Sequence, residues 1–398
     1  MKKVICMILA WCLVLSMAAC SKNETPQTTD PVETIVVDQP NNVTVDPSAE
    51  FHLPVTVVSN VVTEDSLIAD DSPCTFILTY NDVIVASDDL GVDMTIRQDL
   101  ETDLSETRAT AEEVKNDMHT IVSDGGTLQS PGSVTRVIIP SRVDDRIISF
   151  SGYLSVLNSG AAHPNTILKS ATYDATTGSR LTLWDVVSDS AKVDELKDEV
   201  LKRLEKRETE MGVTFNPDYQ DAVMPHFDPE DDNSGSWYLT DEGIVLYFST
   251  YELAPYAVGS IEIAVSYDEM PGLIQDSYLP GTPEKKADGE FVANGNIGGS
   301  PDYLAVQDWK GTAIDLGTKG FVRDVRVERV ISSDGKTYDS LGTLFAADWL
   351  EDGKVVRILA DLPDVMYSLR LSYTGADGRV VRYITQSGKD GSILLVEN

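Results

Sequence analysis

The sequence predicts an α+β fold with an antiparallel sheet and two packed helices over residues 51–280, followed by an all-β, immunoglobulin-like sandwich over 301–398. Three observations predict this order. Runs of alternating apolar and polar residues recur along the chain, as in half-buried strands. Two stretches in the first half instead repeat apolar residues every three or four positions, as amphipathic helices do. Four Asp-Gly pairs punctuate the C-terminal part, where we find no helical period.

Residues 1–20 have the features of a bacterial lipoprotein signal. Two lysines precede an apolar run of 14 residues, and two alanines precede Cys20. The run is shorter than the roughly 20 residues that a membrane-spanning helix needs. We therefore expect cleavage before Cys20, lipidation of its thiol, and anchoring at the extracytoplasmic face of the cell membrane. Cys74 would then be the sole thiol of the mature chain, which excludes an internal disulfide.

Residues 21–50 are rich in Thr, Pro, Asn and acidic side chains, so we expect a disordered tether. The folded part begins at residue 51, and the β-rich runs 55–62 and 75–80 predict its first strands. Apolar residues then recur at helical spacing over 99–122. A strand over 133–140 follows this helix.

The stretch 146–187 organises this first domain. It predicts a strand over 148–156 and a second over 166–173, then a turn at 174–178 and a returning strand over 181–184. A conspicuous loop separates the first two strands, because Gly160 frees the backbone and Pro164 fixes it. After residue 187 we expect a helix that is capped by Ser188 or Asp189. Its buried stripe contains Val193, Leu196, Val200 and Leu204.

Two blocks of sequence resemble the RsiV-like extracellular domain family, which includes the ectodomain of a lysozyme-binding anti-sigma factor and the N-terminal domain of PdaC-type peptidoglycan deacetylases. The first block is GAAHPNT at 160–166, followed by YD at 173–174, TG at 177–178 and LTLWD at 181–185. The second contains WYLT at 237–240, VLYF at 245–248 and YELAPYAVG at 251–259. The resemblance covers about 50–270 and departs from the usual pattern at Ala161, where a second glycine is common.

The C-terminal part is predicted to be a separate all-β domain, and no family resemblance covers it. A stretch rich in Gly, Pro, Asn and charge predicts a linker over 281–300. Beyond it, alternating runs such as 325–330 and 367–373 lie between tight turns, which is typical of a β-sandwich.

Within the first domain, the acidic stretch 228–233 is open to two interpretations, a flexible loop or a calcium site. It lacks the glycine and the distal glutamate of the common calcium loop.

The chain is strongly acidic, with a net charge of −34. Residues 301–398 contain 12 Lys and Arg against 15 Asp and Glu, a net of −3, so −31 falls in residues 1–300. Such a charge disfavours nucleic acid as a partner and favours encounter with a cationic one. General solubility is the plainer explanation of the same charge.

The sequence offers no strong catalytic motif, and we expect no enzymatic activity. It has no zinc-binding H-x-x-x-H or C-x-x-C, no G-x-S-x-G and no phosphate loop, so we expect no metal and no cofactor. Glu252 could pair with Asp174 or Asp185 as in glycoside hydrolysis, although such pairings arise by chance in an acidic chain. His163 has three possible roles, which are bonding to the loop backbone, ligand contact and catalysis.

The candidate binding residues lie in two segments of the resembling blocks. Pro255 stiffens the backbone before Tyr256, which favours an interface anchor, although Tyr251 and Tyr256 could equally close one edge of the core. The predicted set is Gly160, His163, Pro164, Asn165, Tyr251, Pro255 and Tyr256.

The resemblance implies a function in protein binding, with lysozyme as the ligand of the family's anti-sigma factor. The leading hypothesis is therefore a lipid-anchored envelope protein that binds a protein ligand. The alternative is a module that binds peptidoglycan or another cell-wall glycan, which the aromatic residues Trp184, Trp237, Tyr251 and Tyr256 also fit. A cell-wall hydrolase is the third hypothesis.

Overall fold

The computed structural model describes residues 54–68, 74–230, 236–281, 286–294, 300–363, 366–387 and 393–398. The predicted signal with Cys20, the tether and part of the acidic stretch 228–233 lie outside these residues. His52–Asn398 forms one compact unit. Within the described residues, we find no helix whose length and apolar character would allow it to span a membrane.

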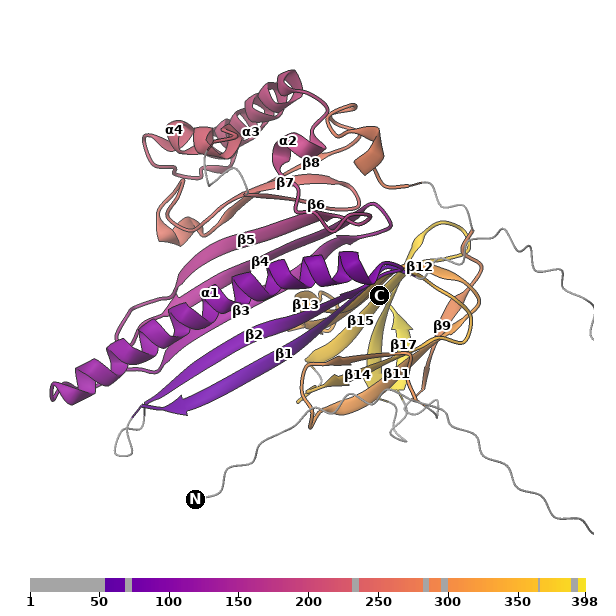
Figure 1. The fold of residues 1–398 in the computed structure, drawn as a ribbon, viewed down its shortest axis with the longest axis horizontal. Helices are drawn as coiled ribbons and strands as arrows, with labels where there is room; N and C mark the ends of the chain where they lie inside the picture. Colours follow the sequence, from indigo (N-terminus) through magenta and orange to yellow (C-terminus); the bar gives the residue numbers. More distant parts are fainter. Residues whose placement is uncertain are drawn as a thin grey trace, which may run out of the picture. The chain divides into compact units, whose positions relative to one another are not determined.

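The fold is mixed α+β and consists mostly of sheets with few helices, as the sequence predicts (Figure 1). The elements in chain order are β1 (Thr56–Leu67), β2 (Thr75–Ala86), α1 (Leu90–Ser123), β3 (Gly132–Val143), β4 (Ile147–Leu157), β5 (Asn165–Asp174), α2 (Leu183–Val186), α3 (Ser190–Met211), α4 (Tyr219–Val223), η1 (Met224–Phe227), β6 (Trp237–Leu239), β7 (Gly243–Phe248), η3 (Tyr256–Val258), β8 (Ile261–Ser266), η4 (Asp276–Tyr278), β9 (Glu290–Asn294), β10 (Tyr303–Val306), β11 (Thr312–Lys319), β12 (Val322–Ile331), β13 (Asp339–Leu350), β14 (Val355–Ala360), β15 (Tyr367–Thr374), β16 (Val380–Ser387) and β17 (Ile393–Glu397).

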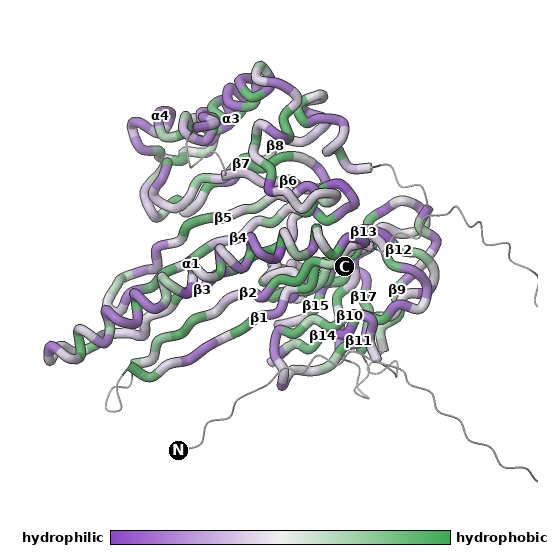
Figure 2. The backbone as a smooth tube through the Cα atoms, viewed as in Figure 1, coloured by the Kyte–Doolittle hydropathy of each residue, from purple (hydrophilic) through white to green (hydrophobic). Residues whose placement is uncertain are grey.

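A ten-stranded sheet is the largest element, with the order β17-β16-β15-β12-β13-β1-β2-β3-β4-β5. Helix α1 connects β2 to β3, which therefore pair in parallel, and it packs on both strands. The helix begins earlier than the predicted 99–122, because the Asp89 side chain accepts a hydrogen bond from the Gly91 N–H at 2.7 Å. Its buried stripe extends back to Val92 and Ile96. Figure 2 shows the resulting alternation of hydrophobic and hydrophilic residues along α1.

A second layer consists of the three-stranded sheet β6-β7-β8 and helix α3. Asp189 caps α3 through a 3.0 Å bond from the Lys192 N–H, and the four predicted stripe residues are buried. They share a core with Leu246, Phe248 and Ile263 of the sheet. The predicted returning strand over 181–184 is wrong, because Leu183–Val186 forms α2. The Asp185 carboxylate accepts the N–H of Thr182 at 2.8 Å and thereby starts a helical turn.

The C-terminal strands form two facing layers. Strands β12, β13 and β15–β17 of the large sheet share an apolar core with the four-stranded sheet β10-β14-β11-β9. Strand β9 lies inside 281–300, the stretch that predicts a linker, and pairs with β11. Because β1 also pairs with β13 through Thr56, Val57 and Val58, the two predicted domains contribute strands to one continuous sheet.

Polar contacts outside the β1–β13 pairing also join the two predicted domains. Arg326 donates to the carbonyls of Pro140 at 2.6 Å and Ser141 at 2.9 Å. The Asp348 N–H donates to the Val55 carbonyl at 3.1 Å. Burial, together with the neighbouring Asp144 and Asp145 carboxylates, raises the pKa of Asp348 to about 8, even though it accepts the Trp349 N–H.

Candidate aromatic binding site

Two loops that are far apart in sequence meet at one end of β5. The β4–β5 loop contributes His163, and the β7–β8 loop contributes Tyr251 and Tyr256. The hydroxyl of Tyr251 lies 3.1 Å from Nε2 of His163. The rings of His163 and Tyr256 stack with centroids 3.7 Å apart and an interplanar angle of 17°. We call His163, Tyr251 and Tyr256 the aromatic cluster.

The β4–β5 loop holds His163 through its own turn chemistry. Gly160 adopts φ +83°, which favours glycine, and its N–H donates to the Ser130 hydroxyl at 3.0 Å. His163 Nδ1 lies 3.3 Å from the carbonyl of Pro164. These contacts fit the tautomer with its proton on Nδ1, in which Nε2 accepts from Tyr251. Asn165 opens β5 and is exposed; its contribution to binding stays a prediction.

The β7–β8 loop presents Tyr251 in an unusual backbone conformation. Its φ is +73°, in the left-handed region that disfavours residues with a side chain, and half of its surface is exposed, 50%. Leu253 and Ala254, which follow, are buried. Pro255 is exposed and precedes the short turn η3 that carries Tyr256. Tyr256 is half-buried, so the two tyrosines differ, and Tyr251 is the more accessible ring.

Glu252 fixes the turn on which Tyr251 sits. One carboxylate oxygen accepts the Ser249 N–H at 2.6 Å, and the other contacts Nε2 of His226. The hydroxyl of Ser249 accepts the Leu168 N–H of β5 at 3.0 Å, which joins the loop to the large sheet. Sequence reasoning missed His226 as a partner of Glu252, because a contact across 26 residues leaves no local pattern.

The acid pairs considered for Glu252 do not form. Asp185 caps α2 through Thr182. Asp174 accepts the N–H groups of Thr176 at 2.8 Å and Thr177 at 2.9 Å. Burial raises the pKa of Asp174, but these hydrogen bonds outweigh it and lower the pKa overall. Both aspartates thus stabilise turns and have no contact with Glu252 that would make a catalytic dyad.

A second cluster lies where α1 crosses the sheet, and it is ionic. Asp103 accepts from Arg136 at 2.5 Å and also contacts Lys169. One turn earlier, Asp99 accepts from the hydroxyl of Tyr173 at 2.6 Å and from Arg180 at 3.2 Å. Burial raises the pKa of Asp103, but Arg136 and Lys169 outweigh it, so the pKa lies below its usual value. We call these side chains the α1 network.

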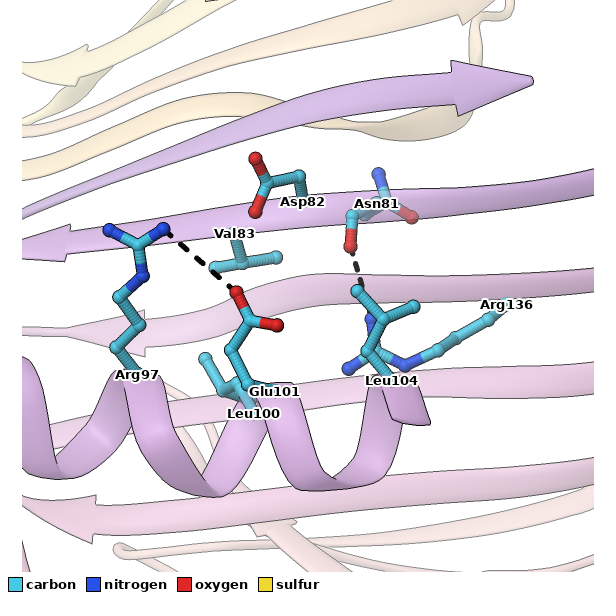
Figure 3. Close-up of a pocket in the computed structure, with 8 residues that line it drawn as sticks. All are labelled: Asn81, Asp82, Val83, Arg97, Leu100, Glu101, Leu104 and Arg136. Carbon is cyan, nitrogen blue, oxygen red and sulfur yellow. Dashed lines mark hydrogen bonds and ion pairs between the residues drawn. The ribbon is translucent and has the colours of Figure 1, made fainter. Parts of the chain in front are cut away.

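A small pocket opens beside the α1 network, and Figure 3 shows its lining. Arg136 is 1% exposed and donates to the carbonyl of Asn81 at 3.1 Å. Arg97 and Glu101 of α1 form an exposed ion pair at 3.9 Å over the other side. The space is enough for about one water molecule, so it does not suit a substrate or cofactor.

Among the described residues, we find no group of three or more His, Cys, Asp and Glu side chains that could hold a metal ion. Of the predicted acidic stretch, Asp228 accepts the N–H of Glu230 at 2.9 Å in a local turn. Asp231 to Asn233 lie outside the described residues, so the calcium hypothesis stays untested there.

Comparisons with known proteins give a match to one family model over part of the chain, and no activity. Residues 185–268 match the model of DUF3298, which is described as a protein of unknown function. The match contains Tyr251 and Tyr256 and ends before the C-terminal layers. The curated proteins include no match to this chain.

Two solved structures are similar to the chain. A member of the DUF3298 family from Bacteroides fragilis is 17% identical, with a TM-score of 0.43, over 56% of this chain and 94% of that one. A DUF3298 family protein from Pseudomonas aeruginosa is 15% identical, with a TM-score of 0.40, over 57% of this chain and 98% of that one.

Proposed function

We propose that this chain is a lipid-anchored protein of the extracytoplasmic face that binds a protein ligand, such as lysozyme, through a surface centred on the aromatic cluster. In this proposal it acts by binding and not by catalysis. The RsiV-like character of residues 51–280, the immunoglobulin-like form of 301–398 and the lipid on Cys20 belong to the same proposal. The two blocks that carry the RsiV-like resemblance meet at the aromatic cluster, which supports it.

The observation that carries the proposal is the conformation of Tyr251. A left-handed backbone costs a residue with a side chain about 1 to 3 kcal/mol, and glycine would avoid this cost. Tyr251 nevertheless exposes half of its surface, so packing explains only part of its presence. An exposed tyrosine on a fixed backbone loses little entropy on binding, which suits an interface anchor.

The charge distribution favours a cationic protein as the ligand. Residues 1–300 carry −31 of the total −34, and a field of this sign speeds the approach of a basic partner. The resemblance points to lysozyme, and lysozymes are typically basic. A lysine or arginine of the partner could also rest on the face of Tyr251, where a cation gains about 0.5 to 2 kcal/mol.

A cell-wall glycan is the second candidate ligand. The half-exposed ring of Tyr251 offers a flat apolar face that could also stack on a sugar. The occurrence of the resembling domain in peptidoglycan deacetylases supports this alternative.

The deciding experiment is calorimetric titration of the purified protein with a c-type lysozyme, beside a pull-down with insoluble peptidoglycan. We expect heat of binding with lysozyme, a tenfold or greater weakening in Tyr251→Ala, and no change in Trp309→Ala. Trp309 is the matched control, because it is an aromatic residue with 76% exposure outside the cluster. If the protein does not bind lysozyme but is retained on peptidoglycan, the cell-wall glycan replaces lysozyme as the proposed ligand. Binding to neither would refute both.

A further inference from the structure

We infer that Glu252 and His226 are positioning residues that hold Tyr251 in its left-handed, half-exposed conformation. The inference rests on the proposed function for its consequence in binding, but its structural content can be tested without a ligand. Neither residue needs to contact the ligand, since Glu252 acts through the backbone of Ser249 and His226 acts through the Glu252 carboxylate.

Glu252 fixes the chain before Tyr251. Its carboxylate accepts the Ser249 N–H at 2.6 Å, and its own N–H donates to the Ser249 carbonyl at 3.1 Å. The two bonds close a tight turn that contains residues 250 and 251. A hydrogen bond to a carboxylate is about twice as strong as one between neutral groups, so this turn is well held.

The chain after Tyr251 is fixed from another element. The Asn216 N–H donates to the Leu253 carbonyl at 2.8 Å, and the Asn216 side-chain amide lies 3.5 Å from the Tyr251 carbonyl. Leu253 is 1% exposed and belongs to the core under α3. With both flanks held, Tyr251 itself must supply the φ of +73° that connects them.

His226 contacts Glu252 from the buried side of the loop. It is 3% exposed, lies edge-on to Phe248 with ring centroids 4.7 Å apart, and contacts the second carboxylate oxygen through Nε2. Its Nδ1 has no hydrogen-bond partner among the described residues, although burial of an unpaired polar atom is unfavourable. An apolar side chain would avoid this penalty, so we assign the imidazole the task of orienting Glu252.

The aromatic cluster supplies a spectroscopic readout of the Tyr251 conformation. Nε2 of His163 lies 3.1 Å from the Tyr251 hydroxyl, and this contact lasts only while the tyrosine stays in place. The chain contains four histidines, so the imidazole nitrogens of the full chain can be followed by NMR after selective ¹⁵N-histidine labelling. Tyr251→Phe marks the signals of His163 after loss of this bond.

The experiment compares Glu252→Ala with Tyr251→Phe and with a matched control, Glu242→Ala. Glu242 is an exposed glutamate in the β6–β7 turn, at the opposite end of strand β7 from Glu252. We expect Glu252→Ala to shift the His163 signals as Tyr251→Phe does, and Glu242→Ala to leave them unchanged. His226→Phe should give a smaller shift in the same direction, because the Ser249 contact of Glu252 remains.

Binding of c-type lysozyme gives a second readout. We expect Glu252→Ala to weaken binding about tenfold, and Glu252→Ala combined with Tyr251→Ala to weaken it no more than Tyr251→Ala alone, because residues that act as a unit are non-additive. Unchanged His163 signals in Glu252→Ala would overturn the inference. If Glu252→Ala fails to fold, Glu252→Gln takes its place, and unchanged signals in both Glu252→Gln and His226→Phe overturn it. A wild-type protein that binds no lysozyme refutes the proposed ligand, while the His163 signals still decide the positioning role.

Discussion

The α1 network attaches strand β5 to distant segments, and the aromatic cluster does the same for the loop before β5, but their chemistry is opposite. In the α1 network, Asp103 contacts two cations, and its guanidinium partner Arg136 is almost fully buried. In the aromatic cluster, the rings are partly exposed and Tyr251 has an unfavourable backbone. The α1 network stabilises the fold, whereas the aromatic cluster contains a surface residue, Tyr251, whose left-handed backbone lowers stability. This difference is what distinguishes a candidate binding site from an equally polar structural cluster.

The largest effect that would test this comparison is expected in the α1 network. Asp103→Ala leaves the buried guanidinium of Arg136 without its counter-ion, which typically costs about 3 to 5 kcal/mol. Urea unfolding measures this loss, and Glu101→Ala is the control, because its exposed pair with Arg97 should contribute less than about 1 kcal/mol. Equal stability of the two variants would remove the structural role assigned to the network. Folded Asp103→Ala should still bind lysozyme as the wild type does.

The next effect concerns the aromatic cluster. Tyr251→Ala should weaken lysozyme binding tenfold or more, by about 1.4 to 3 kcal/mol, within the range of an aromatic anchor, with a small change in melting temperature because the ring is half exposed. Tyr251→Gly should melt above Tyr251→Ala by about 2 to 4 °C, since glycine relieves the left-handed strain. Thermal unfolding and calorimetry measure the two properties. A large fall in melting temperature without loss of affinity would make the cluster a structural one.

Asp348 contrasts with Asp103 of the α1 network, whose pKa is lowered. Asp348 is a buried carboxyl beside other carboxylates, and its pKa is raised to about 8. A group with a raised folded-state pKa contributes stability that is fully present below its unfolded-state pKa and is lost as pH rises through the folded-state pKa. We therefore expect the free energy of unfolding to fall between about pH 4 and pH 8. Asp348→Asn should remove this fall and be more stable at pH 8 by at least about 1 kcal/mol. Parallel pH profiles of the two proteins would contradict the assignment.

The smallest expected effect is that of salt. Exposed charges are screened beyond about 8 Å at physiological ionic strength, so lysozyme binding should weaken severalfold between low and physiological salt. The stability of the α1 network should respond less, because its charges are partly buried. Titrations and urea curves at the same two salt concentrations measure both. Affinity that is independent of salt would favour the glycan as ligand.

Local patterns predicted several elements of this fold correctly. The apolar stripe and cap of α3 lie in one short stretch, and the loop around Gly160 follows from turn chemistry. The first helix was predicted too short, because Gly91 and the polar residues around it obscure a stripe that begins at Val92. The alternation of Leu181 and Leu183 resembles a strand, but the Thr182 capping box makes a helical turn there.

The rest depends on contacts between distant residues, which leave no periodic pattern. Neither the pairing of β1 with β13 nor the contact of His226 with Glu252 can be derived from spacing. For the candidate site, the sequence singled out the two loops that the structure brings together, but it did not predict the hydrogen bond between them. The strain at Tyr251 is equally invisible, since a tyrosine after Thr250 has no special local signature. The left-handed conformation of Tyr251 arises because contacts elsewhere in the fold hold the chain on both sides of this residue.

The pairing of β1 with β13, where the two predicted domains meet in the ten-stranded sheet, has a mechanical consequence. Three residue pairs join β1 to β13, whereas twelve join β1 to β2. Thr56, the first residue of β1, is paired on both sides, and Val55 before it is bonded to Asp348, so tension on the preceding segment enters the folded unit at these two residues. The β13 side should yield first under such a load, because three pairs resist shear less than twelve. A pull through the N-terminal segment would therefore reach the C-terminal layers before it disturbed the loops that carry Tyr251 and His163.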